Sequence, residues 1–222
     1  MSQQPSTNKY QLKVCGLTKI NQIQELISLN VDFLGFIFYE KSPRYVLHHL
    51  SLKEIAEIPH FGKVGVFVNE SIKAIVEITT ESQLDIIQLH GNENEKFILQ
   101  LRQILGNNIK IIKVIRIGNQ SFDELQKTIN QQPSTVNYLL FDTDSKTFGG
   151  TGKTFDWQIL NEIEIPKPYF LSGGISLENI HQRSTINHQP LALDINSKFE
   201  TEPGSKDLEK IKNFTQIVKK IY

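Results

Sequence analysis

The sequence predicts a single (β/α)8 barrel, and three observations support this fold class. Short apolar runs rich in β-branched residues recur eight times, and a longer segment with helical spacing follows each run. This alternation requires a parallel sheet covered by helices. Eight such units in 222 residues fit a closed barrel. An open doubly wound sheet is the alternative, but no Gly-x-Gly-x-x-Gly fingerprint follows the first run.

The expected elements alternate without a linker or a low-complexity tract between them. The strands are predicted at residues 10–15, 31–38, 63–69, 84–90, 110–116, 137–142, 168–173 and 191–195. Helical spacing is found in residues 21–30, 71–82, 94–105, 121–132 and 205–222. We therefore expect one barrel domain over residues 10–222, preceded by a flexible polar tail at residues 1–9. The polar stretch 143–153 is interpreted as a loop, and its glycine-rich part, 148–152, as a mobile cover over the end of the sixth strand.

Composition narrows the class of function. The chain has 24 basic and 24 acidic side chains, so its formal net charge is zero and no nucleic-acid or membrane-binding surface is expected. The polar N-terminus lacks the apolar core of a signal peptide, and no run approaches membrane-spanning length. A single cysteine cannot form an internal disulfide, which favours a reducing cytoplasm. No cluster of ligands indicates a metal, and the outer helix faces are too mixed for the sequence to give the oligomeric state.

The fold class predicts where chemistry occurs, because the active site of such a barrel lies at the C-terminal ends of the strands. Alternation along the first strand places Lys13 and Cys15 toward the barrel axis, and Leu12 and Val14 under the helices. The polar residues expected at these ends are Cys15, Arg44, His90, Arg116, Asp142 and Asp194. Asp142 shares its parity with residues that point inward, so Cys15 and Asp142 are expected to meet across one pocket.

Each of these residues also has a structural interpretation. A lone cysteine most often fills a core, and His90 is expected to be a hydrogen-bonded residue of the barrel mouth and not a catalyst. Lys13, if it points inward, requires a carboxylate partner, because an unpaired buried ammonium is costly. Asp194 could orient a sugar hydroxyl or pair with Arg116, and the sequence leaves both alternatives open.

Glycine-bearing loops follow the seventh and eighth strands. Gly173 and Gly174 allow close approach of a ligand to backbone N–H groups, and Ser197 lies in the polar loop after the eighth strand. Barrels of this class often bind phosphate between these two loops, near the start of a short extra helix. Residues 148–154 do not have the spacing of a nucleotide P-loop.

The residues named above lie within a series of motifs that resembles the phosphoribosylanthranilate isomerase family from about residue 10 to the C-terminus. The motifs, in order, are KVCGLT, DFLGFIFYEKSPRYV, VGVFVNE, IIQLHGNE, LLFDT, FGGTGKTFDW, LSGGISLENI and TEPGSKDLEKI. The resemblance implies that Cys15 is the general base, that Asp142 is the general acid, and that Arg44 holds the anthranilate carboxylate. Together with the loop argument above, we expect substrate contacts from Gly173, Gly174, Asp194, Asn196 and Ser197. Asn196 and Lys198 depart from the pattern, since a serine and a small glycine are expected there.

The implied reaction is the Amadori rearrangement of N-(5-phosphoribosyl)anthranilate in tryptophan biosynthesis. An acid protonates the ribose ring oxygen, and a base then removes the proton from the adjacent ribose carbon. We expect Asp142, beside Phe141, to stay partly protonated, and the pKa of Cys15 to fall from about 8.5 toward neutrality. No cofactor is needed, and the expected partner is the small-molecule substrate. The histidine-pathway enzyme with the same chemistry should have an aspartate where this chain has Cys15, and a non-catalytic barrel should have lost Cys15 or Asp142.

Overall fold

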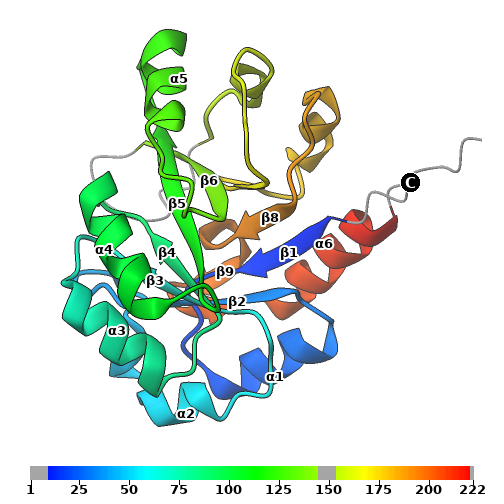
Figure 1. Cartoon of the computed structure of the whole chain (residues 1–222). Coiled ribbons are helices and arrows are strands. Elements are labelled where there is room, and N and C mark those ends of the chain that lie inside the picture. The colour runs from blue at the N-terminus through cyan, green and yellow to red at the C-terminus, as the bar shows by residue number, and fades with distance from the viewer. Residues whose placement is uncertain (1–9, 145–153, 221–222) are drawn as a thin grey trace, which may run out of the picture.

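The eight predicted strands form a closed parallel barrel in which neighbours in the chain are neighbours in space. The computed structural model describes residues 10–144 and 154–220, and Figure 1 shows its helices around the outside of the strands. The strands are β1 (Gln11–Val14), β2 (Phe33–Ile37), β3 (Lys63–Phe67), β4 (Ile86–Leu89), β5 (Lys110–Ile117), β6 (Tyr138–Thr143), β7 (Tyr169–Leu171) and β8 (Ala192–Ile195). The pairing of β1 with β8, with Lys13 opposite Asp194, closes the barrel. The predicted fold class is confirmed.

Side-chain alternation separates two apolar regions. One fills the inside of the barrel with residues from alternate positions of the strands, among them Val64, Ile112, Leu140 and Phe170, all fully buried. The other lies between the strands and the helices and includes Leu12 and Val14, as expected from their parity. Above the inner cluster, a third small group consists of Cys15, Ile37 and Val66. The inside of the barrel is therefore filled by apolar side chains, and the reactive thiol of Cys15 lies toward the C-terminal ends of the strands.

The five helices predicted from periodicity are all present, although their boundaries are shorter than expected. They are α1 (Ile20–Ser28), α3 (Ile72–Glu81), α4 (Glu95–Leu105), α5 (Phe122–Asn130) and α6 (Leu208–Lys220). Three of them begin at the predicted polar residue, because the side chains of Ser71, Asn94 and Ser121 accept a hydrogen bond from the first turn. A further short helix, α2 (Leu52–Ala56), begins at a Ser51–Glu54 capping box.

Helices do not follow every strand as the repeating pattern had predicted. In the described part of the chain, the connections after β6 and β7 contain the 3-10 helices η2 (Trp157–Asn161) and η3 (Ile180–Thr185) in place of α-helices. The segment of η3 reads IHQRST, and its Ser184 and Thr185 hydroxyls donate to backbone carbonyls three residues earlier, which favours a short local turn over a long helix. The expected polar tail at residues 1–9 and the expected cover at residues 148–152 lie outside the described residues.

A short irregular segment connects β8 to α6. The 3-10 helix η4 (Ser197–Phe199) leads into a hairpin of β9 (Glu200–Glu202) and β10 (Ser205–Lys206), in which Gly204 has a φ of 85°. The fully buried Phe199 anchors this segment by packing edge-on against Phe214 of α6. The hairpin brings Glu200 and Lys206 to the end of the barrel where the predicted site residues lie. None of the helices in the described ranges is both long and apolar enough to cross a bilayer.

Candidate active site

A cavity that is partly open to solvent lies at the C-terminal ends of the strands. The position is the one that the barrel fold predicts for a site of chemistry. Seven of the eight predicted site residues line this cavity, namely Cys15, Asp142, Gly173, Gly174, Asp194, Asn196 and Ser197. Arg44 is the exception and is described below with its partners.

Cys15 follows β1 and faces the barrel axis, as its parity predicts. Its side chain packs with Ile37 and Val66 and is 5 % exposed. Gly35 of β2 makes room for it, because a Cβ at that position would lie 2.9 Å from Cys15 Cα and 3.0 Å from Cys15 Sγ. Burial raises the pKa of the Cys15 thiol, although the ammonium groups of Lys13 and Lys206 act in the opposite direction. The expectation that this pKa falls toward neutrality is therefore wrong for this structure, and desolvation is the reason.

Lys13 and Asp194 form a buried ion pair between the first and last strands. Their Nζ and Oδ1 atoms are 2.9 Å apart, and the Lys13 side chain is fully buried. Burial disfavours the charged ammonium, but attraction to Asp194 and to Cys15 outweighs it, so the pKa of Lys13 is raised. Lys13 thus has the carboxylate partner that it required. The alternative pairing of Asp194 with Arg116 is wrong, since Arg116 donates instead to Asn92 Oδ1.

Asp142 lies one residue before the end of β6, in a setting that suits a carboxylic acid. Burial and the negative charge of Asp194 raise the pKa of Asp142 to about 7, against a hydrogen bond of 2.8 Å from the Thr143 N–H to Oδ1. The expected partial protonation is thus confirmed in direction. Its cause is not Phe141, which points away from the cavity into the layer under the helices.

Gln88 of β4 and His90, which follows this strand, line the cavity wall next to Asp142. His90 Nε2 lies 3.4 Å from Asp142 Oδ2, and the Gln88 amide nitrogen lies 3.1 Å from His90 Nδ1. Burial, with the charges of Lys13, Arg116 and Lys113, lowers the pKa of His90 to about 3, so the ring is neutral at neutral pH. Donation by the amide to Nδ1 places the ring hydrogen on Nε2, facing Asp142.

Gly173 and Gly174 follow β7 with φ values of 82° and 71°. A Cβ on Gly173 would lie 2.5 Å from Thr143 Oγ1 and 3.3 Å from Asp142 Oδ1, so this glycine packs directly against the end of β6. Consecutive residues in this conformation turn the backbone sharply, and only glycine adopts it readily. The turn exposes backbone to the cavity beside Ser197.

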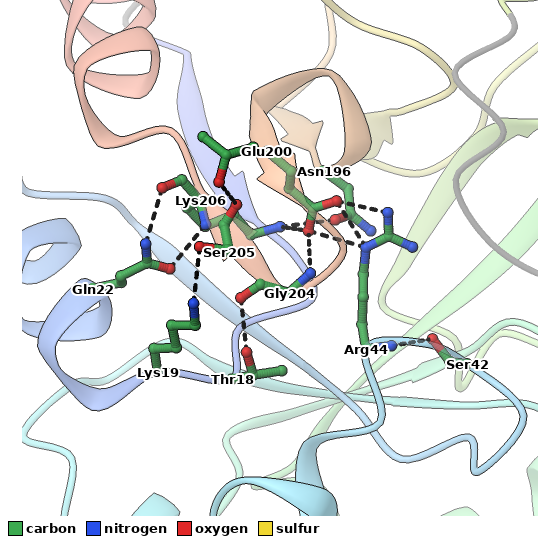
Figure 2. A network of polar contacts seen from close by, with 11 residues as sticks. Thr18, Lys19, Gln22, Ser42, Arg44, Asn196, Glu200, Gly204, Ser205 and Lys206 are labelled. Atoms are coloured by element: carbon green, nitrogen blue, oxygen red, sulfur yellow. Dashed lines mark hydrogen bonds and ion pairs between the residues drawn. The ribbon is translucent and has the colours of Figure 1, made fainter.

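Arg44 belongs to a network of polar contacts beside the cavity, shown in Figure 2. Its Nε lies 3.0 and 2.9 Å from the two Glu200 carboxylate oxygens, and its Nη2 lies 2.6 Å from Oε2. Lys206 Nζ contacts Glu200 Oε1 at 2.6 Å and Asn196 Oδ1 at 2.8 Å, so one buried carboxylate serves two cations. Gly16 allows this packing, because a Cβ there would lie 2.6 Å from Arg44 Cδ.

Sequence reasoning missed part of this site. Gln88 and Glu200 are not among the predicted site residues, and His90 was expected only as a hydrogen-bonded residue of the barrel mouth. Gln88 could have been found, because a buried amide two residues before a strand-end histidine shares its inward parity. Glu200 gave no such signal, since it lies in the short hairpin after β8, outside the predicted strands, and its pairing with Arg44 spans 156 positions of sequence.

The chain is similar to known proteins over most of its length. The family model described as N-(5'phosphoribosyl)anthranilate (PRA) isomerase matches residues 12–217. A curated N-(5'-phosphoribosyl)anthranilate isomerase from Petrotoga mobilis is 41 % identical over 204 residues, covering 90 % of this chain and 93 % of that protein. One from Parabacteroides distasonis is 38 % identical over 208 residues, covering 92 % and 91 %.

Solved structures agree with the sequence relatives. The phosphoribosyl anthranilate isomerase of Thermotoga maritima superposes with a TM-score of 0.75 at 32 % identity, covering 96 % of this chain and all of that one. A phosphoribosyl anthranilate isomerase solved with reduced 1-(o-carboxyphenylamino)-1-deoxyribulose 5-phosphate gives a TM-score of 0.73 at 28 % identity and covers 96 % of this chain.

Proposed function

Because this chain belongs to the N-(5'-phosphoribosyl)anthranilate isomerase family, an enzyme family of tryptophan biosynthesis, we propose that Cys15 and Asp142 are its general base and general acid. The observation that carries the assignment is that both groups line one cavity at the strand ends, where Asp142 has a pKa of about 7. The reaction converts N-(5'-phosphoribosyl)anthranilate to the open-chain 1-(2-carboxyphenylamino)-1-deoxyribulose 5-phosphate.

Asp142 acts first in this proposal. Its carboxylic acid gives a proton to the ribose ring oxygen, the bond from that oxygen to the anomeric carbon breaks, and an iminium ion forms. A group with a pKa near neutrality keeps a substantial protonated fraction and still releases its proton readily. The N–H of the neutral His90 ring faces the carboxylate that remains, so His90 positions Asp142 and stabilises its charged form.

Cys15 acts in the second step. Its thiolate removes the proton from the ribose carbon next to the iminium carbon, which gives an enolamine and the neutral thiol. The enolamine then tautomerises to the ketone. Cys15 releases its proton to solvent and Asp142 takes one up, so both groups are restored and no proton is consumed overall. Because burial raises the pKa of Cys15, the active form with a thiolate and a protonated Asp142 is a minor fraction of the enzyme. Lys13 and Lys206 increase this active fraction, because their positive charges favour the thiolate.

The remaining predicted residues are assigned to the two charged ends of the substrate. The backbone at Gly173, Gly174 and Ser197 is proposed to bind the phosphate, with Asn196 beside it. Arg44 is proposed to hold the anthranilate carboxylate through Nη1, since Glu200 binds the Nε and Nη2 edge. Gln88 Oε1 is buried without a hydrogen-bond partner among the described residues, which suits acceptance from a ribose hydroxyl. Asp194 is proposed to orient the sugar from its ion pair with Lys13.

A small phosphorylated substrate and a single free thiol both suit a cytoplasmic enzyme, and we propose that location.

Turnover of freshly made phosphoribosylanthranilate, followed by loss of its fluorescence, tests the assignments. We expect Cys15→Ala and Asp142→Asn each to lower kcat by about 10²-fold or more while the protein stays folded. Asp144→Asn is the matched control, because this exposed carboxylate lies two residues beyond Asp142 and does not line the cavity. Near-normal turnover by either site variant would remove that residue from the mechanism, and Cys15 would then be a core-filling residue.

A further inference from the structure

Lys198 lies at the end of the cavity where the proposed phosphate site is found. It is the middle residue of η4, between Ser197, which also lines the cavity, and the buried anchor Phe199. The Phe199 N–H donates to the Asn196 carbonyl at 2.9 Å, so the backbone that carries Lys198 is fixed at both sides. The Lys198 side chain itself is exposed and lines the cavity. It can therefore reach a ligand without moving the loop.

The charges around the cavity single out Lys198. Arg44 and Lys206 both bind Glu200, and Lys13 binds Asp194, so the buried cations nearest the site already have carboxylate partners. Lys198 is the one cationic residue in the cavity lining of the described chain, and no carboxylate among those residues lies within 4.0 Å of its Nζ.

The exposed carboxylate of Glu178 has a pKa that the charge of Lys198 affects. Its pKa is lowered mainly by the Ser176 hydroxyl and its own backbone N–H, and only then by Lys210 and Lys198. Glu178 therefore does not fix the Lys198 ammonium, which stays available at the cavity mouth.

The cavity lining does not balance the negative charge of the substrate's phosphate group. The cavity contains the carboxyl groups of Asp142 and Asp194, whereas a phosphate monoester carries close to two negative charges at neutral pH. Backbone N–H groups at Gly173, Gly174 and Ser197 supply hydrogen bonds but no full positive charge. A cation at this end would attract the phosphate and offset repulsion from the two acids.

We propose that Lys198 binds the phosphate group of the substrate and thereby sets the affinity of this enzyme for its phosphorylated substrate. The proposal rests on the proposed function and adds a residue at the position where a small glycine was expected. A lysine is a mobile point charge, and the phosphate does not react, so its attraction should be similar for the substrate and the transition state. Lys198 should therefore act on KM and not on kcat.

The test compares Lys198→Gln, Lys198→Arg and the control Lys212→Gln, which removes the same charge from an exposed position on α6. We expect Lys198→Gln to raise KM about 10-fold, leave kcat within about twofold, and raise the inhibition constant of inorganic phosphate by a similar factor. It should also weaken the salt dependence of kcat/KM. Lys198→Arg should restore KM, and Lys212→Gln should match the unmodified enzyme.

Two outcomes separate this inference from the proposed function. If the unmodified enzyme turns over its substrate and Lys198→Gln has unchanged KM and phosphate inhibition, the inference is wrong and the function stands. If turnover is absent, calorimetric binding of inorganic phosphate to both proteins still decides. Equal affinity overturns the role of Lys198, whereas weaker binding to Lys198→Gln supports it.

Discussion

At the scale of single residues, the thiol of Cys15 shows how a reactive group can be buried and still poised. Burial raises its pKa, and Lys13 and Lys206 oppose that rise. We expect alkylation by iodoacetamide to accelerate with pH through a value above the ordinary thiol pKa of about 8.5. The pH profile of kcat/KM should be bell-shaped, with an acidic limb near 7 from Asp142 and an alkaline limb from Cys15.

Alkylation of Asp142→Asn supplies the control for that measurement. The substitution removes a neighbouring carboxylate without touching the thiol, so the alkaline dependence should persist while the acidic limb of activity disappears. Rapid alkylation at pH 6, in either protein, would mean that the thiolate is already formed at rest and would contradict the proposed protonation state.

The sequence was sufficient for some residues of this site and insufficient for others, for a physical reason. Cys15 and Asp142 could be placed because alternation along a strand fixes which side chains face the barrel axis. The environment of Arg44 could not be predicted, because its partner Glu200 comes from a hairpin of irregular register after β8. The direction of the Cys15 pKa also depends on burial by Ile37 and Val66, and burial is a property of the assembled barrel.

At the scale of elements, Gly35 of β2 determines where Cys15 stands. A methyl group added at Gly35 would lie 2.9 Å from the Cys15 backbone, which cannot move aside as a flexible side chain can. We expect Gly35→Ala to lower kcat at least about 10-fold by displacing the base, and to cost about 1–3 kcal/mol of stability. Turnover and thermal unfolding measure the two effects.

Gly65→Ala is the matched control for this prediction. Gly65 also lies within a strand, β3, and its added Cβ would meet Leu84 Cδ1 at 2.4 Å and Phe67 Cε2 at 2.9 Å, under the helices and away from the cavity. It should destabilise the protein with little change in kcat. Equal loss of kcat in both variants would show that general destabilisation, and not displacement of Cys15, explains the result.

Periodicity predicted the long helices well because an apolar stripe of three turns is a strong signal. It did not predict the 3-10 helices η2 and η3 after β6 and β7, since their few apolar residues, such as Trp157 and Leu160, are buried without a repeating stripe. Local hydrogen bonds such as that from Gln158 N–H to Asp156 Oδ1 determine these short elements instead.

At the scale of the whole molecule, ionisation of the buried Asp142 carboxyl group reduces the stability of the folded protein. A pKa raised from 3.8 to about 7 corresponds to about 4 kcal/mol less favourable ionisation of Asp142 in the folded protein. The unfolded chain ionises first as pH rises, so this cost is absent below pH 4, grows between pH 4 and 7, and is complete above pH 7. Asp142→Asn should therefore raise Tm relative to the parent protein, and this rise should be larger at pH 8.5 than at pH 5. The gain in the free energy of unfolding should differ between the two pH values by about 1–3 kcal/mol.

Asp144→Asn again serves as the comparison, since it makes the same change at an exposed position that does not line the cavity. Thermal unfolding of the three proteins at the two pH values is sufficient. A Tm advantage of Asp142→Asn that is equal at both pH values would show that Asp142 ionises as easily in the folded protein as in the unfolded chain.

The pairing of Lys13 with Asp194 also has a consequence for how the molecule is made. The two residues are 181 positions apart, and the ammonium is completely buried. While the chain emerges from the ribosome, β1 is present long before β8 exists, and a lysine enclosed without its carboxylate would be strongly unfavourable. The first strand therefore cannot settle in its final environment until the last strand docks beside it. Intermediates on the ribosome should consequently lack a formed catalytic centre, and the enzyme becomes competent only when its two ends meet.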